Sequence, residues 1–266
     1  MGVLNVTPDS FSDGGDHLEP GTAVAAGLAM TDAGADIVDI GGESTRPGSD
    51  PTDTGEEMRR VLPVVSELAT SGIVVSIDTQ KPEVASAALD AGAEIVNSIN
   101  GLRASGMLEV CARHGAGVVA MHMQGTPKTM QIAPSYDDVV DEVCAFLAER
   151  SGAAETAGID SERICLDPGI GFGKTYEQNL GLLANLEQIV AIGRPVLVGT
   201  SRKGFLGEIL RRAGRETAAR ERDGATAATV AGVIAAGAAV VRVHDVAAGF
   251  EAARTTDAIV RGSQGE

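Results

Sequence analysis

Residues 164–174, with the sequence ICLDPGIGFGK, place a carboxylate where an apolar strand runs into a glycine-rich turn. Pro168 ends the strand because it has no amide hydrogen for the ladder, and the glycines allow the backbone to approach a ligand closely. At the open end of a parallel strand, Asp167 can accept hydrogen bonds from the donor edge of a flat, nitrogen-rich heterocycle. Taken alone, the segment is equally consistent with a turn capped by an Asp, so its meaning depends on what the other strands carry.

Polar or charged side chains also follow the other apolar runs of the chain, each at or just after the predicted strand end. They are Asn5, Thr45 with Arg46, Asp78, Asn97, His122, Lys203, and Arg242 with His244. In a parallel barrel the chemistry is found at the carboxyl ends of the strands, whereas a barrel without a function would scatter such residues. This convergence predicts an enzyme.

The residues at the strand ends fall into two chemical groups. The first combines carboxylate acceptors with an amide that both donates and accepts, which suits a ring with adjacent N–H donors and a carbonyl; it consists of Asp78, Asn97 and Asp167. The second consists of donors suited to a phosphate or pyrophosphate: Arg46, Lys203, Arg242 and His244, with Asn5 as a possible metal ligand. Taken singly, Asp78 or His244 is more often a structural residue than a catalytic one.

Lys203 lies in the segment GTSRKG, at 199–204, where a predicted strand ends and a predicted helix begins. The free amides of a helix N-terminus can hold a carboxylate or another anion. The chain uses arginine far more often than lysine. A compact ammonium that donates to a ring nitrogen or carbonyl explains this lysine, although a surface lysine remains the simpler alternative.

Short β-branched runs alternate with longer helical segments along the chain, which predicts eight strands. The predicted strands are 2–6, 36–40, 74–77, 94–96, 117–121, 164–166, 195–198 and 239–243, and the clearest helices are 56–69, 83–91 and 136–157. Eight such units favour an α/β fold of the (β/α)₈ TIM-barrel type, as a single domain over 1–266, rather than an open doubly wound sheet. No GxGxxG fingerprint follows the first strand to support a dinucleotide-binding fold.

Three connections after strands are predicted to be extended, namely 7–20, 41–54 and 122–135, which are βα loops 1, 2 and 5. The polar stretch 211–223 is expected to be a solvated surface insertion. Because the first strand begins at Gly2, nothing ahead of it is expected to cover the floor of the barrel.

Composition narrows the classes of partner. A formal net charge of −16 argues against nucleic acid, which needs a basic face, and it requires that cations be gathered locally if the substrate is anionic. Neither a membrane span nor a signal peptide is apparent, so a cytoplasmic location is expected. Cys111, Cys144 and Cys165 are far apart in apolar contexts, and we expect them to be buried without forming a disulfide or a metal site.

With these segments in view, the chain closely resembles the dihydropteroate synthases, the folate-pathway family inhibited by sulfonamides. The matching motifs are MGVLNVTPDSFSDGG at 1–15, GGESTRPG at 41–48, SIDT at 76–79, IVNSI at 95–99, MHMQGTPKTMQ at 121–131, LDPGIGFGK at 166–174, GTSRKG at 199–204 and RVHDV at 242–246. They occur in the order of the family and extend over the whole chain.

The resemblance implies that 6-hydroxymethyl-7,8-dihydropterin pyrophosphate condenses with 4-aminobenzoate, with Mg²⁺ present, to give 7,8-dihydropteroate and pyrophosphate. By the same resemblance the pterin is held by Asp78, Asn97, Asp167, Lys203 and Arg242, and the pyrophosphate by Asn5, Thr45, Arg46, Arg242 and His244. The aminobenzoate or sulfonamide pocket is formed by Phe11, Thr45, Phe172, Lys203 and Gly204, and Asn5 is the metal ligand. The family is usually a homodimer.

The implied mechanism is dissociative, because the departing diphosphate needs stabilising more than the aniline nitrogen needs activating. Asp13, Lys203, Arg242 and His244 are the residues expected to take part, with Asp13 stabilising a pterin-methyl cation. A general base of tuned pKa is not required by this route.

Two positions depart from the family pattern. Ser98 replaces the Asp that commonly follows the strand-four Asn, so a partner of Asn97 is missing or replaced. Gly204 stands where the family often has Ser. If that hydroxyl binds the aminobenzoate carboxylate, its loss costs roughly 1.5 to 3 kcal/mol, unless backbone amides or water substitute.

Three other functions remain open from the sequence. A methyltetrahydrofolate-corrinoid methyltransferase shares the pterin acceptors but does not need the pyrophosphate residues of the SRKG and RVHDV segments. A sulfonamide-insensitive synthase is disfavoured because no residue is inserted beside Phe11, although Gly204 keeps it open. A non-catalytic pterin-binding protein would be expected to lose Lys203 or Arg242, and both are present.

Overall fold

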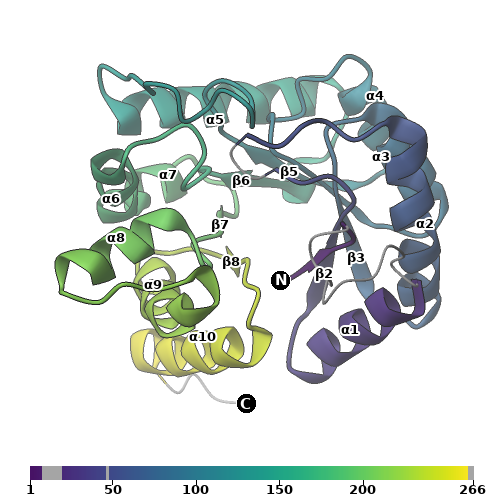
Figure 1. Ribbon diagram of the computed structural model, residues 1–266. Helices are drawn as coiled ribbons and strands as arrows, with labels where there is room; N and C mark the ends of the chain where they lie inside the picture. The colour runs from purple at the N-terminus through teal and green to yellow at the C-terminus, as the bar shows by residue number, and fades with distance from the viewer. Residues whose placement is uncertain (8–19, 46–47, 263–266) are drawn as a thin grey trace.

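The computed structural model describes residues 1–7, 20–45 and 48–262 as a ring of parallel strands surrounded by helices (Figure 1). The strands are β1 (Gly2–Asn5), β2 (Ile37–Gly41), β3 (Val74–Asp78), β4 (Ile95–Ser98), β5 (Gly117–Met121), β6 (Ile164–Asp167), β7 (Leu197–Val198) and β8 (Val240–Val241). The helices are α1 (Pro20–Asp32), α2 (Thr54–Thr70), α3 (Pro82–Asp90), α4 (Met107–His114), α5 (Val139–Thr156), α6 (Tyr176–Ala184), α7 (Leu186–Val190), α8 (Gly204–Arg212), α9 (Asp223–Ala235) and α10 (Val246–Arg261).

The strands close into the predicted barrel. β1 to β6 form one parallel sheet in sequence order, and β7 pairs with β8. Two backbone bridges join these sheets, one between Leu166 and Val196 and one between Gly2 and Val243. The amide of Val3 donates to Val243 O at 3.0 Å, so the first and last strands meet. The carboxyl ends of all eight strands therefore face the same mouth.

β7 and β8 are shorter than the sequence predicts. The apolar runs 195–198 and 239–243 contribute only two strand residues each, because their flanking residues make single bridges instead of a continuous ladder. α5 begins at Val139 rather than at Tyr136, since Asp138 accepts hydrogen bonds from the amides of Val140 and Asp141 and so caps the helix.

The loop predictions have mixed outcomes. The second and fifth extended connections are present, with Asp53 capping α2 at the end of the second, whereas most of the first lies outside the described residues. The stretch 211–223 is largely exposed, as predicted. Its end is not merely solvated, however, because Asp223 is half-buried and pairs with Arg202.

The cysteines are free, as predicted, but only Cys111 is buried. Cys144 and Cys165 are half-buried, which corrects the expectation for these two residues. Cys144 lies on α5, a helix with one face toward solvent, and Cys165 lines a pocket at the floor of the barrel. No helix of the described residues has the length and apolarity needed to span a bilayer.

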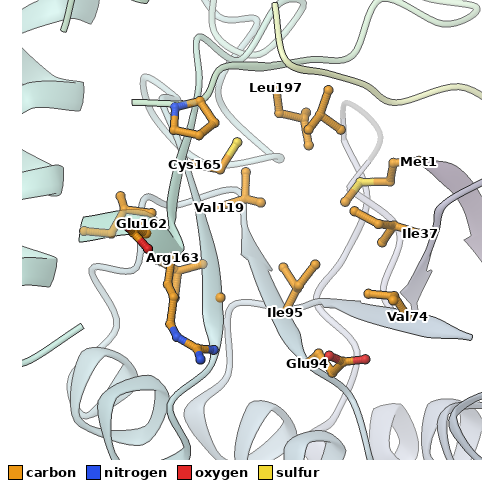
Figure 2. A pocket seen from close by; sticks show the side chains of 15 residues that line it. Met1, Ile37, Val74, Glu94, Ile95, Val119, Glu162, Arg163, Cys165 and Leu197 are labelled. Carbon is orange, nitrogen blue, oxygen red and sulfur yellow. The ribbon is translucent and has the colours of Figure 1, made fainter. Parts of the chain in front are cut away.

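The floor pocket has a volume of about 310 Å³ and opens at the end of the barrel where the strands begin (Figure 2). Its walls come from first residues of strands, such as Ile37, Val74 and Ile95, and the Met1 side chain points into it. The site described below lies at the opposite end of the same strands.

Candidate functional site

Arg242, just after β8, lies between two carboxylates at the mouth. Its Nε donates to Asp39 Oδ2 at 2.6 Å and its Nη2 donates to Asp78 Oδ2 at 2.9 Å. Asp78 ends β3, whereas Asp39 lies within β2 and is completely buried. Burial raises the pKa of Asp78 well above its usual range, against the lowering effect of Arg242. The two ion pairs hold the guanidinium over the strand ends.

Asn97 joins the same cluster from β4. Its Nδ2 donates to Asp39 Oδ2 at 3.0 Å, and strand pairing places it directly beside Asp78. Asp39 is thus the partner of Asn97 in this chain. Ser98, which replaces the family's usual Asp, makes a different contact, because its hydroxyl donates to Asn100 Oδ1 at 2.9 Å.

Asp167 and Lys203 form the second half of the predicted ring-binding set. The Asp167 carboxylate is buried and accepts from the Gly169 amide at 2.7 Å. The Lys203 ammonium donates to Ile170 O and lies 4.8 Å from the centre of the Phe172 ring. Burial raises the pKa of Asp167 and lowers that of Lys203 to about 8, and each group partly offsets the shift of the other.

The surroundings of Gly199 show that the Arg242 cluster lies next to the pair formed by Asp167 and Lys203. A Cβ added to this glycine would lie 3.7 Å from Arg242 Cβ and 3.8 Å from Lys203 Nζ. Arg242 also lowers the pKa of Asp167 through its charge. The structure therefore brings together all five residues predicted to hold the ring: Asp78, Asn97, Asp167, Lys203 and Arg242.

Asn5 and His244 lie at the margins of this cluster. A Cβ at Gly41 would lie 3.6 Å from Asn5 Oδ1 and 3.9 Å from Asp78 Oδ2, so Asn5 and Asp78 flank the same strand end. His244 Nδ1 lies 3.0 Å from Ser201 Oγ, and the Ser201 hydroxyl accepts from the His244 amide. Burial, together with the nearby cations, lowers the pKa of His244 to about 4, so this ring is neutral near pH 7.

The predicted aminobenzoate pocket is described only in part. Phe172 is half-buried beside Lys203, and Gly204 is exposed as the first residue of α8. Thr45 is half-buried in the second loop. Phe11, Asp13 and Arg46 lie outside the described residues.

The sequence assigned no role to two residues that support this site. Asp39 is one, and the only signal for it is a carboxylate inside an otherwise apolar strand. Lys174 is the other. Its buried ammonium contacts Gly169 O at 3.0 Å, Phe172 O at 2.9 Å and His122 Nδ1 at 3.0 Å, which fixes the glycine-rich turn after Asp167.

Comparison with known proteins agrees with a pterin site. Residues 1–244 match the family model described as "Pterin binding enzyme". The chain belongs to this family of pterin-binding barrels.

Relatives define the branch of the family. The dihydropteroate synthase of Escherichia coli is 46% identical over 259 residues, which covers 97% of this chain and 90% of the relative. The solved Xanthomonas albilineans dihydropteroate synthase with 4-aminobenzoic acid is 47% identical, with a TM-score of 0.89 and coverage of 97% of this chain and 91% of that chain. The same enzyme in complex with 7,8-dihydropteroate has a TM-score of 0.86 at 45% identity, with coverage of 97% and 92%. Within the pterin-binding enzymes, the chain belongs to the dihydropteroate synthases.

Proposed function

We propose that the chain condenses 6-hydroxymethyl-7,8-dihydropterin pyrophosphate with 4-aminobenzoate, giving 7,8-dihydropteroate and pyrophosphate. The observation that carries this proposal is the position of Arg242. Its guanidinium contacts Asp39 and Asp78, and its charge reaches Lys203, whose pKa it helps to lower, so acceptors for a ring and cations for a diphosphate share one mouth. The solved relatives with 4-aminobenzoic acid and with 7,8-dihydropteroate support the same substrates.

In this proposal the ring is recognised by complementary hydrogen bonds. Asp167 and Asp78 accept from ring N–H groups, while Asn97 and Lys203 donate to a ring carbonyl or nitrogen. Because the site is largely buried, these hydrogen bonds are stronger than they would be in water. The set excludes rings without the matching donors, since each unpaired buried polar group costs roughly 1 to 3 kcal/mol.

The proposed mechanism follows from the charge that develops on the departing diphosphate. Arg242 contacts the ring acceptor Asp78 at the mouth, and in this proposal it stabilises that charge without having to move. His244 is neutral near pH 7, so it supplies a hydrogen bond rather than a full charge. Thr45 and Arg46 add donors from the second loop, and Asp13 from the first loop stabilises the pterin-methyl cation.

Asn5 fits the binding of Mg²⁺ carried by the diphosphate. Mg²⁺ is usually held by one or two protein oxygens together with phosphate oxygens and waters. The Asn5 amide oxygen, which flanks the same strand end as Asp78, would be one such ligand. When bound, the ion would neutralise part of the charge of the leaving group.

A homodimer and a cytoplasmic location are parts of the same proposal. The dimer rests on the family resemblance, and light scattering on the purified chain tests it, because a monomeric mass would contradict it. The location is supported by three free cysteines, which are typical of a reducing compartment.

A coupled pyrophosphate-release assay, with the pteroate product measured in parallel, tests the function. We expect pteroate only when pterin pyrophosphate, 4-aminobenzoate and Mg²⁺ are all present. Arg242→Met should lower kcat/KM by about 100-fold or more, the usual effect of losing one charge-stabilising donor. Lys128→Met, which breaks an exposed ion pair with Asp50, should leave kcat/KM unchanged. If the purified, folded protein made no pteroate in this assay, the proposal would be overturned.

A further inference from the structure

Lys81 joins two carboxylates at the base of the second loop. Its Nζ lies 2.6 Å from Glu43 Oε2 and also contacts Glu57 Oε2. The Glu57 side chain is only 1% exposed and that of Glu43 only 12%, so the cluster of Lys81, Glu43 and Glu57 is largely desolvated. Burial alone would lower the pKa of Lys81, but its hydrogen bonds to Glu43 and Glu57 outweigh this effect and raise it. The ammonium therefore stays charged and compensates for one of two buried negative charges.

Glu43 is the residue through which this cluster fixes the loop. Besides binding Lys81, its Oε2 accepts from the Thr52 amide at 2.8 Å, so it ties the beginning of the loop to its end. Its Oε1 accepts from Gln80 Nε2 at 3.4 Å. Thr45, predicted to contact the diphosphate, lies only two residues after Glu43.

Lys81 also connects this loop to the strand that carries Asp78. Lys81 immediately precedes α3, three residues after Asp78, and its amide donates to Thr79 Oγ1 at 3.2 Å. The Thr79 hydroxyl donates to Glu57 Oε1 at 2.7 Å. The charge of Glu57 already reaches the site, because it contributes to the raised pKa of Asp78. Loss of Lys81 would thus free the loop and increase the negative field beside a site for an anion.

We propose that Lys81 is a positioning residue for the diphosphate group of the pterin substrate: through Glu43 it fixes Thr45, and through both carboxylates it lowers the negative field at the mouth. This inference rests on the proposed function. It assigns Lys81 no contact with the substrate. Replacing Lys81 should therefore weaken the binding of a ligand that carries a diphosphate more than the binding of one that does not. A general structural role would weaken both equally.

The test compares two probes on the full chain by isothermal titration calorimetry: 6-hydroxymethyl-7,8-dihydropterin and its pyrophosphate with Mg²⁺. For Lys81→Met we expect the Kd of the pyrophosphate form to rise by about tenfold, equivalent to 1.4 kcal/mol. The Kd of the hydroxymethyl form should change by less than about twofold. Lys81→Arg retains a cation that can bridge both carboxylates, and it should restore most of the lost affinity.

Lys128→Met is the matched control. Lys128 also binds the second loop, at Asp50 with an Nζ–Oδ1 distance of 2.7 Å, but these side chains are 66% and 81% exposed. Because exposed ion pairs contribute little, both probes should bind this variant as they bind the unmodified chain.

Each outcome separates the inference from the function on which it rests. If Lys81→Met lost affinity equally for both probes, or lost affinity for neither, the role of Lys81 would be overturned. An unmodified chain that binds the pyrophosphate form no better than the hydroxymethyl form would instead contradict the proposed diphosphate site. If Lys81→Met does not fold, the double variant Lys81→Met with Glu57→Gln keeps the original net charge of the cluster and so isolates the loss of loop anchoring through Glu43. We expect it to show a smaller loss of affinity that is still confined to the pyrophosphate form, and an equal effect on both probes would overturn the role of Lys81.

Discussion

Arg242 and the fully buried carboxylate of Asp39 form an ion pair beneath the mouth of the barrel, with 2.6 Å between Nε and Oδ2. The same carboxylate oxygen accepts from Asn97. The other oxygen, Oδ1, has no hydrogen-bond partner in the part of the chain that the structure describes. Asp39 therefore orients both a cation and an amide of the site without extending from the end of a strand itself.

Asp39→Asn should weaken both stability and activity. It leaves Arg242 with only Asp78 as a charged partner, and breaking a buried ion pair from one side costs about 3 kcal/mol or more. We expect the free energy of unfolding to fall by about 3 kcal/mol and kcat/KM to fall by at least about tenfold. Urea denaturation and steady-state kinetics measure these effects, with exposed Asp32→Asn as the control. An unchanged kcat/KM would show that Asp39 does not orient the site.

The contrast between Asp39 and Asp167 shows how far the sequence predicts this site. Asp167 is recognisable because a strand, a proline and a glycine-rich turn surround it. Asp39 lies in a strand buried on both faces, where no alternation indicates which side chains point into the barrel. Its partner Arg242 is 203 positions away, so only the closed barrel brings the two together. Local pattern predicts strand ends, whereas the ion pairs that orient them depend on tertiary packing.

The same distinction between local pattern and tertiary packing explains which parts of the fold the sequence predicts. Periodicity predicts all eight strands, but the ends of β7 and β8 depend on pairing across the closure, which a run of apolar residues does not encode. The start of α5 depends on the Asp138 cap. Burial of Cys144 and Cys165 depends on which face of an element meets the core.

Gly204→Ser should tighten the binding of 4-aminobenzoate and of a sulfonamide. A Cβ at Gly204 would meet no described atom within 4 Å, so a serine side chain fits without displacement. Its hydroxyl would stand at the start of α8, where it can donate to a carboxylate. A charge-assisted hydrogen bond of roughly 1.5 kcal/mol predicts about a tenfold lower Kd in a calorimetric titration.

Gly204→Ala is the control for this substitution. It adds a Cβ and removes the flexibility of glycine, but it supplies no hydroxyl. We therefore expect its affinity to match that of the unmodified chain. Equal affinities of the serine and alanine variants would contradict a role for the hydroxyl.

Activity should decline above about pH 8 because Lys203 loses its proton. Burial lowers the pKa of this ammonium to about 8, and only the charged form can donate three hydrogen bonds. Since kcat/KM reports the free enzyme, its alkaline limb should bend near that pH. Lys203→Arg, although less active, retains its charge and should move the bend to higher pH. An alkaline limb at the same pH in both proteins would assign it to another group.

Lys174 is buried to 2% exposure, and its ammonium contacts the carbonyl oxygens of Gly169 and Phe172 together with His122 Nδ1. Burial lowers the pKa of Lys174 to about 7, and Lys203 contributes to the lowering while Asp167 opposes it. Burial also lowers the pKa of His122 to about 3, so this ring accepts as a neutral group near pH 7. Lys174→Met has a side chain of similar shape without the ammonium, so comparing it with the unmodified chain reports the titration of Lys174.

Lys174→Met should show a pH-dependent difference in stability from the unmodified chain. Between about pH 7 and the ordinary lysine pKa of about 10.4, the unfolded chain binds one more proton at this position than the folded chain. The free energy of unfolding of the unmodified chain should therefore rise relative to that of the variant, by up to about 1.4 kcal/mol per pH unit. Lys203 is present in both proteins, so its own contribution largely cancels, and only its coupling to Lys174 stays in the difference. Urea denaturation at pH 7, 8 and 9 measures it, and a difference that stays constant would show that Lys174 keeps an ordinary pKa.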